Sequence, residues 1–346
     1  MASPILEINL SAIARNWSTL NQLSKTEVET SAVVKADGYG LGATHVVNTL
    51  LKVGITKFFV ATAEEGAVLR QSVQGNFDIF ILSGYMQGDK DLVRNYNLFP
   101  IILSKDQFER MVNDFDKLPF ALQINTGMNR LGMEKKHFLE LHEKIFERKP
   151  LIVMSHLSSA ENPHSSANSE QLTLFRELTS GINCQLSLAA SGGILLGSDY
   201  HFDLCRPGIG LYGGINYSGI KSVINVKVPV IQVQDVSSGH GVGYDLTWVA
   251  DKPTRVATIA AGYADGLIRS LSNNSFVFAN TTPCPVIGRI SMDLITVDVS
   301  KLADIPDYFD ILSHEQSVFD LAHQAGTISH EILVALGSRY KRTYLN

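Results

Sequence analysis

Residues 31–42 read SAVVKADGYGLG, and this stretch shows how the first two-thirds of the chain are organised. The β-prone run Ser31–Val34 leads into Lys35, glycines follow, and an amphipathic pattern predicts a helix over Gly42–Lys52. A lysine at the end of a buried strand is poorly solvated, which lowers its pKa as a Schiff-base lysine requires. A lone strand-end lysine more often points to water. Here, however, the glycines and a helix start favour a phosphate, and the phenol of Tyr39 is near, so the stretch indicates pyridoxal phosphate.

Strand and helix patterns alternate through the first 224 residues. The candidate strands are Ser31–Val34, Phe58–Ala61, Asp78–Leu82, Leu98–Leu103, Phe120–Ile124, Leu151–Ser155, Cys184–Leu188 and Phe202–Cys205. The clearest helical patterns are Ser11–Leu23, Gly42–Lys52, Lys136–Arg148 and Ser169–Thr179. Apolar strands that alternate with helices predict a parallel sheet covered by helices. Eight candidates favour a closed (β/α)8 TIM barrel over residues 1–224, although an open sheet gives a similar alternation. In such barrels the chemistry lies at the C-terminal strand ends.

The pattern changes after Ile224. Short β-prone runs and turns follow, with no long helical pattern before about Gln316. The candidate strands are Val226–Val236, Arg255–Ala260, Ser275–Ala279, Pro285–Ile290 and Leu294–Val299. Residues 225–346 are therefore predicted to form a mainly β domain.

Composition excludes several classes of protein. A net charge of −5 and a pI near 6.1 give no sign of a nucleic-acid or anionic-membrane partner. The start of the chain shows no secretory signal, and no apolar run is long enough to span a bilayer. Cys184, Cys205 and Cys284 are too far apart for a disulfide framework or a zinc site, so we expect no metal and a reducing, cytoplasmic location.

Six further stretches complete a pattern with the lysine motif. They are Asn125–Gly132 (NTGMNRLG), Met154–Leu157 (MSHL), Leu204–Gly213 (LCRPGIGLYG), Gly241–Tyr244 (GVGY), Ala261–Gly266 (AGYADG) and Gly288–Asp293 (GRISMD). Taken in this order, they resemble the alanine racemases, which are fold-type III pyridoxal phosphate enzymes. The resemblance covers nearly the whole chain. It implies interconversion of L- and D-alanine, and in bacteria a supply of D-alanine for the cell wall.

The resemblance implies two bases on opposite faces of the substrate. Lys35 matches the lysine that binds the cofactor covalently and acts on the D-enantiomer. Tyr244 matches the base for the L-enantiomer. Because a free phenol has a pKa of about 10, Tyr244 needs a lowered pKa or a partner to act as a base.

Other residues match the family's cofactor contacts. Tyr39, Ser191 and the backbone of Gly208 and Ile209 match the phosphate cradle, although Ser191 alone reads equally well as a helix cap. Arg206 matches the arginine at the pyridine nitrogen, whereas a single arginine after a strand is more often part of a surface ion pair. A guanidinium stays charged and does not readily give its proton to the ring, which favours racemisation over transamination.

The remaining matches concern the substrate and the partner subunit. His156 matches a histidine that bonds both the tyrosine base and the pyridine-facing arginine, although a lone histidine at a strand end is more often structural. Arg130 and Met292 match groups near the substrate carboxylate. The resemblance implies a homodimer with shared active sites, in which Tyr244 and Met292 come from the other subunit.

The chain also departs from the family. Gln123 stands where many members have a carbamylated lysine, so Arg130 would be a buried cation without a charged partner. We therefore expect an anion such as chloride near Gln123 and Arg130, or a direct amide contact. Ser187 and Ala190 replace a histidine and an asparagine of some members. Ser338 falls where many have a phosphate-binding tyrosine.

Other functions compete with this interpretation. Gly208–Gly213 matches the G-x-G-x-x-G pattern of NAD-dependent dehydrogenases, but a poor helix follows it. A broad alanine/serine racemase stays open, because a small pocket rejects an added hydroxyl only weakly. A decarboxylase of the same fold type would typically have glutamate in place of Arg206. A non-catalytic pyridoxal phosphate carrier would lack the domain that carries Tyr244.

Overall fold

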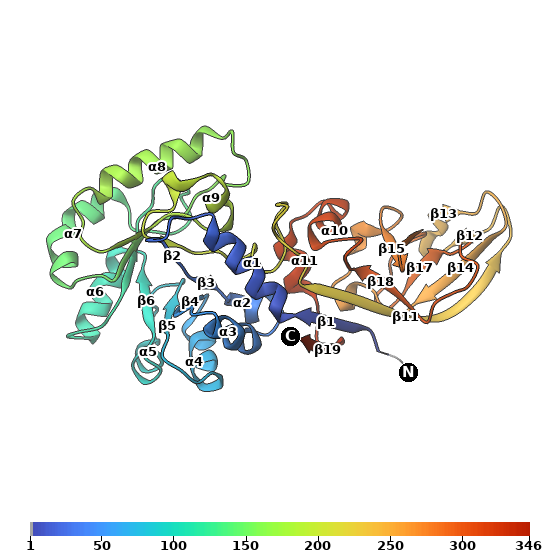
Figure 1. Cartoon of the computed structure of the whole chain (residues 1–346), viewed down its shortest axis with the longest axis horizontal. Coiled ribbons are helices and arrows are strands. Elements are labelled where there is room, and N and C mark those ends of the chain that lie inside the picture. The colour runs from blue at the N-terminus through green and yellow to red at the C-terminus, as the bar shows by residue number, and fades with distance from the viewer. Residues whose placement is uncertain (1–2) are drawn as a thin grey trace. The chain divides into compact units, whose positions relative to one another are not determined.

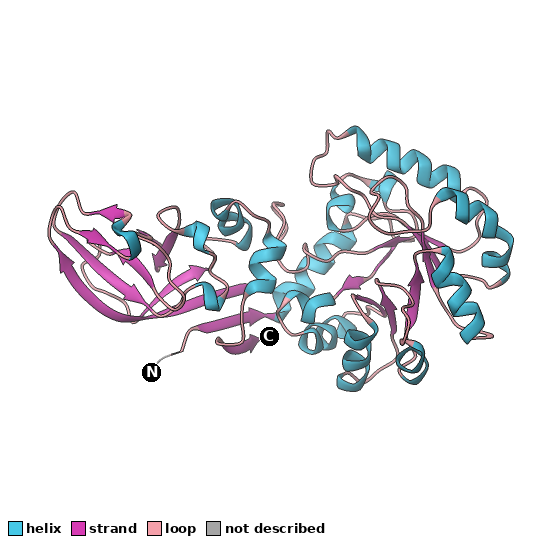
Figure 2. Ribbon diagram, turned by 180° about the vertical axis from the view of Figure 1, so that it is seen from behind, coloured by secondary structure: helices cyan, strands magenta, loops and turns pink. Residues whose placement is uncertain are grey.

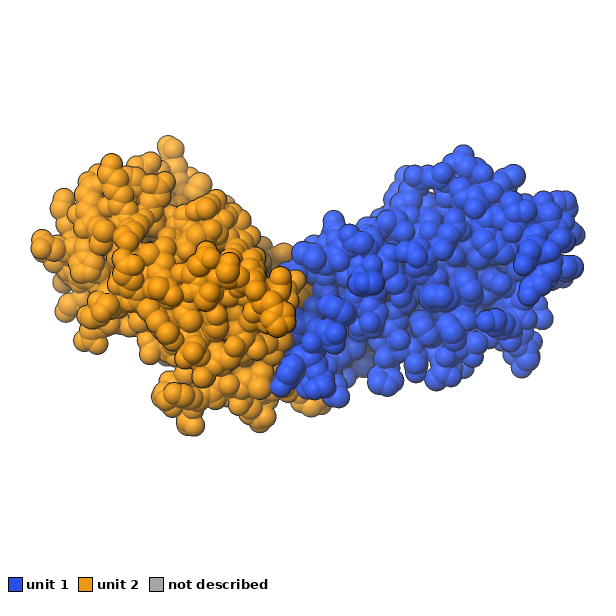
Figure 3. All heavy atoms as spheres, turned by 90° about the horizontal axis from the view of Figure 1, so that it is seen from above, with its two compact units in different colours: residues 1–13, 39–41, 212–346 blue, residues 14–38, 42–211 orange. Residues whose placement is uncertain are grey.

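The computed structural model describes residues 3–346, which form two compact units (Figure 3). The barrel unit comprises residues 14–38 and 42–211, and the β unit comprises, of the described residues, 3–13, 39–41 and 212–346. Met1 and Ala2 lie outside the described residues. Within residues 3–346, no helix combines the length and the apolar character needed to cross a bilayer.

Parallel strands form the centre of the barrel unit (Figure 1). They are β2 (Glu29–Thr30), β3 (Ala32–Val33), β4 (Lys57–Val60), β5 (Asp78–Ile81), β6 (Phe99–Ile102), β7 (Ala121–Gln123), β8 (Ile152–Met154), β9 (Gln185–Ser187) and β10 (Leu204–Cys205). Neighbours pair in sequence order from β3 to β9, and β10 pairs with β2. Strands β3 to β8 are mostly apolar and buried, as expected when both faces of a parallel sheet are covered, whereas β2 and β9 are more polar.

Backbone hydrogen bonds close the ring. Ser31 N and Val33 N donate to the carbonyls of Cys205 and Pro207, which joins β10 to the first strand. Arg206 N donates to Ala189 O at 2.9 Å, which joins β10 to the chain that follows β9. With β2 and β3 counted as one strand interrupted at Ser31, the predicted eight-stranded barrel is confirmed, and the open-sheet alternative is wrong.

Helices cover the outside of the strands (Figure 2). They are α1 (Leu10–Gln22), α3 (Ala43–Lys52), α4 (Ala63–Ser72), α5 (Lys90–Asn95), α6 (Lys105–Asp114), α7 (Lys135–Glu147), α8 (Ser166–Thr179) and α9 (Ser191–Leu195). Local sequence sets some of their starts. Thr62 and Ser104 accept hydrogen bonds from the amides of Glu65 and Gln107, which satisfies the first turns of α4 and α6.

The β unit is built around one mainly antiparallel sheet. Its strands are β1 (Ile5–Asn9), β11 (Ile224–Val236), β14 (Thr254–Ile259), β15 (Phe276–Ala279), β16 (Thr282–Pro285), β17 (Ile295–Asp298), β18 (Tyr308–Leu312) and β19 (Lys341–Leu345). The short strands β12 (Gly241–Val242) and β13 (Trp248–Val249) form a separate pair, and the helices are α10 (Val318–Ala325) and α11 (Ser329–Ala335). The long strand β11 pairs with β1 and β18 up to Pro229 and with β14 from Val230 onward. Pro229, where the partners change, has no N–H to donate.

Two features of the β unit differ from the sequence expectation. Strand β1 pairs with β11 and β19, so residues 3–13 belong with the β unit, and this unit begins again at Tyr212 rather than at 225. The predicted strand Pro285–Ile290 is wrong. The strand is Thr282–Pro285, and Gly288 then turns the chain with a φ of +73°.

We expect Leu6→Ala to destabilise the β unit by about 2–5 kcal/mol, because the side chain is fully buried in β1 between two paired strands. Denaturant unfolding followed by tryptophan fluorescence measures the change. Leu345→Ala on the neighbouring β19 is the control, since Leu345 is largely exposed. Equal losses in the two variants would contradict a core role for β1.

Candidate active site at the mouth of the barrel

Lys35 lies directly after β3, at the C-terminal end of the barrel strands. Its side chain is half-buried, and Val34 N donates to Phe59 O next to it. The residues that follow, from Ala36 to Gly40, all have positive φ and form a left-handed turn. Glu65 fixes this turn, because its carboxylate accepts from Ala36 N at 2.9 Å and from Ala61 N at 2.8 Å.

The surroundings of Lys35 favour its neutral amine. Burial lowers the pKa of Lys35 and the charge of Arg130 lowers it further, while Glu65 opposes the shift. The desolvation expected from the sequence is confirmed. A neutral amine has the free lone pair that a nucleophile or a base requires.

The glycine-rich loop does not offer a helix start to an anion. Asp37 Oδ1 accepts from Ala43 N, the first residue of α3, at 2.8 Å. A carboxylate at that point repels a phosphate, so the expectation of a phosphate site at the start of α3 is wrong.

Arg206 is the most buried charge at this end of the barrel. Its side chain is 2 % exposed. Nη2 donates to Ser155 O at 2.6 Å and Nη1 donates to the hydroxyl of Ser187, whose oxygen in turn lies against Leu204 O. Burial lowers the pKa of Arg206 to about 10, so the group stays charged at neutral pH. No carboxylate within residues 3–346 forms an ion pair with it.

His156 follows β8 and is held neutral. Burial and the charges of Arg206, Arg130 and Lys35 lower the pKa of His156 to about 3. In the described part of the chain, no hydrogen bond joins its ring to Arg206, because the guanidinium is bonded to Ser155 and Ser187 instead. The contact implied by the resemblance is therefore absent from this structure.

Ser191 binds the chain that follows Arg206. Its Oγ accepts from Gly208 N and Gly210 N, each at 3.0 Å. It is the first residue of α9 and makes no capping bond there, so the cap interpretation is wrong. Its own hydrogen stays available for another acceptor, and buried Ile209 lies between the two bonded glycines.

Arg130 and Gln123 differ from the expectation in their surroundings. Gln123 is buried at the end of β7 and its Nε2 donates to Leu131 O at 3.2 Å. Arg130 is exposed, so the premise that it is a buried cation is wrong. Its charge nevertheless acts on both Lys35 and His156.

Tyr39, Tyr244 and Met292 belong to the β unit. Tyr39 is buried and stacks on Tyr212 with ring centroids 4.6 Å apart, and burial raises the pKa of Tyr39 so that it stays a neutral donor. Tyr244 is 69 % exposed and Met292 is 53 % exposed. The structure thus gathers Lys35, Arg206, His156 and Ser191 in one unit and leaves Tyr244 on the surface of the other.

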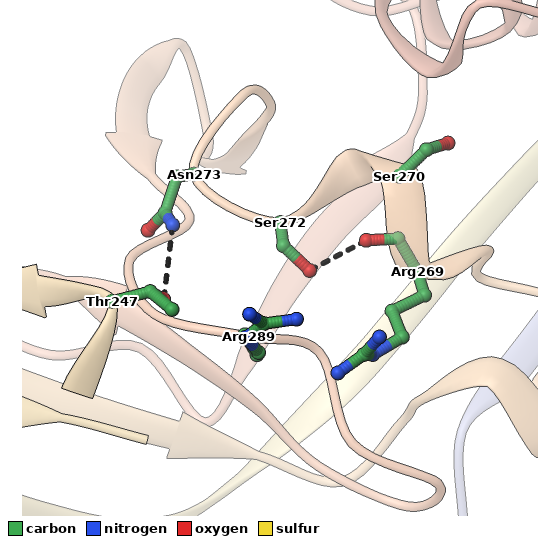
Figure 4. Close-up of a pocket in the computed structure, with 6 residues that line it drawn as sticks. All are labelled: Thr247, Arg269, Ser270, Ser272, Asn273 and Arg289. Carbon is green, nitrogen blue, oxygen red and sulfur yellow. Dashed lines mark hydrogen bonds between the residues drawn. The ribbon is translucent and has the colours of Figure 1, made fainter. Parts of the chain in front are cut away.

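The loop that carries Tyr244 is held by polar contacts beside an open hollow (Figure 4). Asn273 Nδ2 donates to Thr247 Oγ1 at 3.2 Å, and Arg289 Nε lies 3.1 Å from Asp245 Oδ2. Asp245 has a φ of +59°, so these contacts hold a backbone turn that is otherwise unfavourable. They fix the position of the residue next to Tyr244.

Tyr340 does not replace the family tyrosine that is absent at Ser338. Its hydroxyl is buried and donates to Asp265 O at 2.9 Å. The hydroxyl therefore supports the β unit internally.

Sequence reasoning missed Glu65, Ser155, Thr126 and Gln171. Ser155 is the last residue of the predicted strand Leu151–Ser155 and directly follows β8, so it could have been found by its place at a strand end. The other three act through hydrogen bonds between segments far apart in the chain, which a sequence pattern does not show. The dehydrogenase alternative is excluded by the closed barrel and because no helix follows Gly208–Gly213.

Comparison with known proteins decides the family. The family description "Alanine racemase, N-terminal domain" matches residues 8–216, and "Alanine racemase, C-terminal domain" matches residues 223–344. The chain belongs to the alanine racemase family. An alanine racemase of Ruegeria sp. (strain TM1040) is 48% identical over 345 residues, with 99% of each chain covered. That of Rhizobium meliloti (strain 1021) is 38% identical over 370 residues, with 99% of this chain and 97% of that protein covered.

Solved structures of the family share the fold. Alanine racemase from Bartonella henselae with covalently bound pyridoxal phosphate is similar with a TM-score of 0.94 and 37% identity, and each chain is fully covered. Biosynthetic alanine racemase from Pseudomonas aeruginosa has a TM-score of 0.94 at 29% identity, again with full coverage of both chains.

The family cofactor is pyridoxal phosphate, and the residues of the barrel mouth fit it. Arg130 and Arg206 are cations, Lys35 is an amine with a lowered pKa, and the carboxylate that acts on Lys35, that of Glu65, is occupied by two backbone amides. Such a site favours an anionic ligand with a carbonyl group that an amine can attack.

The Lys35 pKa responds to its two charged neighbours. In the cofactor-free protein, we expect Arg130→Met to raise the pKa of Lys35, because a repelling cation is removed. Glu65→Gln should lower it further, since the attraction of a carboxylate is lost. NMR titration of 13C-methylated lysines measures both values. Shifts in the opposite directions, in folded variants, would contradict the assigned electrostatics.

Proposed function

We propose that this chain is a pyridoxal phosphate-dependent racemase that interconverts L- and D-alanine with Lys35 and Tyr244 as its two bases. The observation that carries the proposal is the half-buried lysine among uncompensated cations at the mouth of a barrel of the alanine racemase family. A cytoplasmic role in supplying D-alanine for bacterial cell-wall synthesis follows from this activity.

The residues of the barrel mouth would hold the cofactor at both of its ends. Ser191, Tyr39 and the backbone N–H of Ile209 would suit a phosphate as neutral donors, whereas the predicted donor Gly208 N is already bonded to Ser191 Oγ. Bound pyridoxal phosphate supplies an electron sink for the carbanion at the substrate α-carbon. Arg206 would face the pyridine nitrogen and, because it stays charged, would donate a hydrogen bond there while keeping its proton. This weakens the electron sink and favours return of the proton to the α-carbon.

The two bases divide the proton transfers. Lys35 would exchange a proton with the face of the D-enantiomer, and Tyr244 with the face of the L-enantiomer. The neutral His156 would give Tyr244 a hydrogen bond without adding charge, so that the positive field on the phenol comes from Arg206. Arg130 and Met292 would contact the substrate carboxylate.

A homodimer with shared sites would place Tyr244 and Met292 of one subunit against the barrel of the other. Support comes from their exposure, together with that of Leu246 and Val249 near Tyr244, because exposed apolar groups that lie together mark contact surfaces. A broad alanine/serine racemase is the alternative for the substrate. A decarboxylase is disfavoured by Arg206, and a non-catalytic carrier is disfavoured by the presence of Tyr244.

Mixed dimers test the shared site. Lys35→Ala should lose both racemisation and the covalent link to the cofactor. Tyr244→Phe should also lose racemisation. If the variants are unfolded and refolded together, half of the dimers are mixed, and each mixed dimer has one intact site. Activity should return to about a quarter of the wild-type value. Polarimetry with alanine measures it. No recovery, with mixed dimers shown by mass spectrometry, would contradict the sharing of residues.

We also propose that an anion, most simply chloride, lies between Gln123 and Arg130. The support is that Gln123 supplies an amide without charge, and that no ion pair of Arg130 is found in the described chain. A direct bond from Gln123 Oε1 to Arg130 is the rival arrangement.

Chloride dependence of the kinetics separates these arrangements. At constant ionic strength, replacing chloride by the bulky anion gluconate should raise the KM for alanine more than it changes kcat, because Arg130 is placed at the substrate carboxylate. A Gln123→Glu variant, which supplies its own charge, should depend less on chloride. Unchanged wild-type kinetics in gluconate would eliminate the anion.

A further inference from the structure

Gln171 is a polar side chain buried on α8, a helix that covers the barrel. It is 2 % exposed, and every hydrogen-bonding atom of its amide is used. Nε2 donates to His156 O at 2.9 Å and to Thr126 Oγ1 at 3.3 Å. Oε1 accepts from Ser158 N at 2.8 Å and from Ser158 Oγ at 3.0 Å. A buried amide is costly unless it is satisfied in this way, so the residue is specified by these partners.

The bonds of Gln171 fix the segment that follows β8. His156 O and Ser158 N lie on either side of Leu157, and one amide binds both. The third partner, Thr126, belongs to the loop after β7. The helix thus holds two neighbouring strand ends at a set position relative to each other.

A chain of hydroxyl groups extends this control to Ser155. Ser155 Oγ donates to Ile124 O at 2.8 Å, so its single proton is used. Thr126 Oγ1, which lies 2.8 Å away, must then donate to Ser155 Oγ, and Gln171 Nε2 donates to Thr126. The directions of all three bonds are fixed, and no member of the chain titrates near neutral pH.

The segment held in this way carries two parts of the proposed site. Ser155 O is the acceptor for Arg206 Nη2, and Ser155 N donates to Ser187 O on the neighbouring strand. The ring of His156 is on the next residue. A shift of this backbone moves both the guanidinium and the imidazole.

We propose that Gln171 is a positioning residue that holds Arg206 and His156 in place through the backbone of residues 155–158. The proposal rests on the function proposed above, in which Arg206 faces the pyridine nitrogen. Gln171 touches neither substrate nor cofactor. Its effect on the reaction is to keep the guanidinium, rather than water, beside that nitrogen.

Asn168 supplies a matched control. It lies one turn earlier on α8, is 2 % exposed, and donates to Asn162 O at 2.9 Å and to Ser159 O at 3.3 Å. It binds the far part of the same segment and, within the described chain, makes no hydrogen bond to residues 155–158. Gln171→Met and Asn168→Leu therefore remove comparable buried amides from one helix.

The first measurement is the product ratio with L-alanine. In the competing side reaction the proton would return to the cofactor carbon instead of the α-carbon. Hydrolysis by water would then release pyruvate, and the amino group would stay on the cofactor as pyridoxamine phosphate. Gln171→Met should raise the ratio of pyruvate to racemised alanine about tenfold, the effect of losing one buried hydrogen bond. Asn168→Leu should leave the ratio unchanged, although both variants lower the unfolding temperature. Equal ratios in wild type and in folded, cofactor-loaded Gln171→Met would overturn the proposal.

The second measurement needs no cofactor. NMR titration of His156 in the cofactor-free proteins should show its pKa rising toward the ordinary value in Gln171→Met, as the ring moves away from the cations, but not in Asn168→Leu. If Gln171→Met does not fold, Gln171→Glu replaces it. Its protonated form still donates to His156 O, so its pyruvate ratio should rise with pH as the carboxyl ionises, and a flat ratio would overturn the proposal. Absence of racemisation in the wild type would instead overturn the proposed function.

Discussion

The buried charge of Arg206 is the constraint on which the rest of the site depends. Its backbone amide closes the barrel to the chain after β9, and its guanidinium spans Ser155 and Ser187 on two neighbouring strand ends. A buried cation is tolerated only when its donors are satisfied, and here the satisfying groups are neutral. Arg206 therefore contributes to the closure of the barrel through its backbone amide and to the positive potential of the site through its guanidinium.

That potential sets the protonation of the other site residues. Together with burial, which is the larger cause, it lowers the pKa of His156 and keeps the ring neutral, and the charge of Arg130 adds to burial in lowering the pKa of Lys35. In the proposed function, an amine that is easily deprotonated, a neutral imidazole and a permanent guanidinium would accept an anionic cofactor and move protons without protonating the pyridine ring. The reaction specificity follows from electrostatics rather than from a single catalytic group.

The sequence predicted the barrel because parallel strands appear as apolar runs, and it placed Lys35 and Arg206 at strand ends where the structure has them. It could not place β1, whose partners β11 and β19 are more than 200 residues away. It overextended a strand to Ile290 because the turn at Gly288 depends on its backbone conformation. Exposure of Arg130, the bond of Asp37 to α3 and the role of Gln171 are set by packing between distant segments, which residue type does not reveal.

Incubation of the cofactor-loaded protein with L-alanine in D₂O tests the central claim most directly. Chiral chromatography with mass spectrometry follows both enantiomers and their α-hydrogen. The account predicts that D-alanine appears with deuterium at the α-carbon, that the mixture approaches equal amounts of the two enantiomers, and that pyruvate stays a minor product. L-alanine that keeps its α-hydrogen, or pyruvate as the main product, would contradict a racemase whose specificity comes from the Arg206 site.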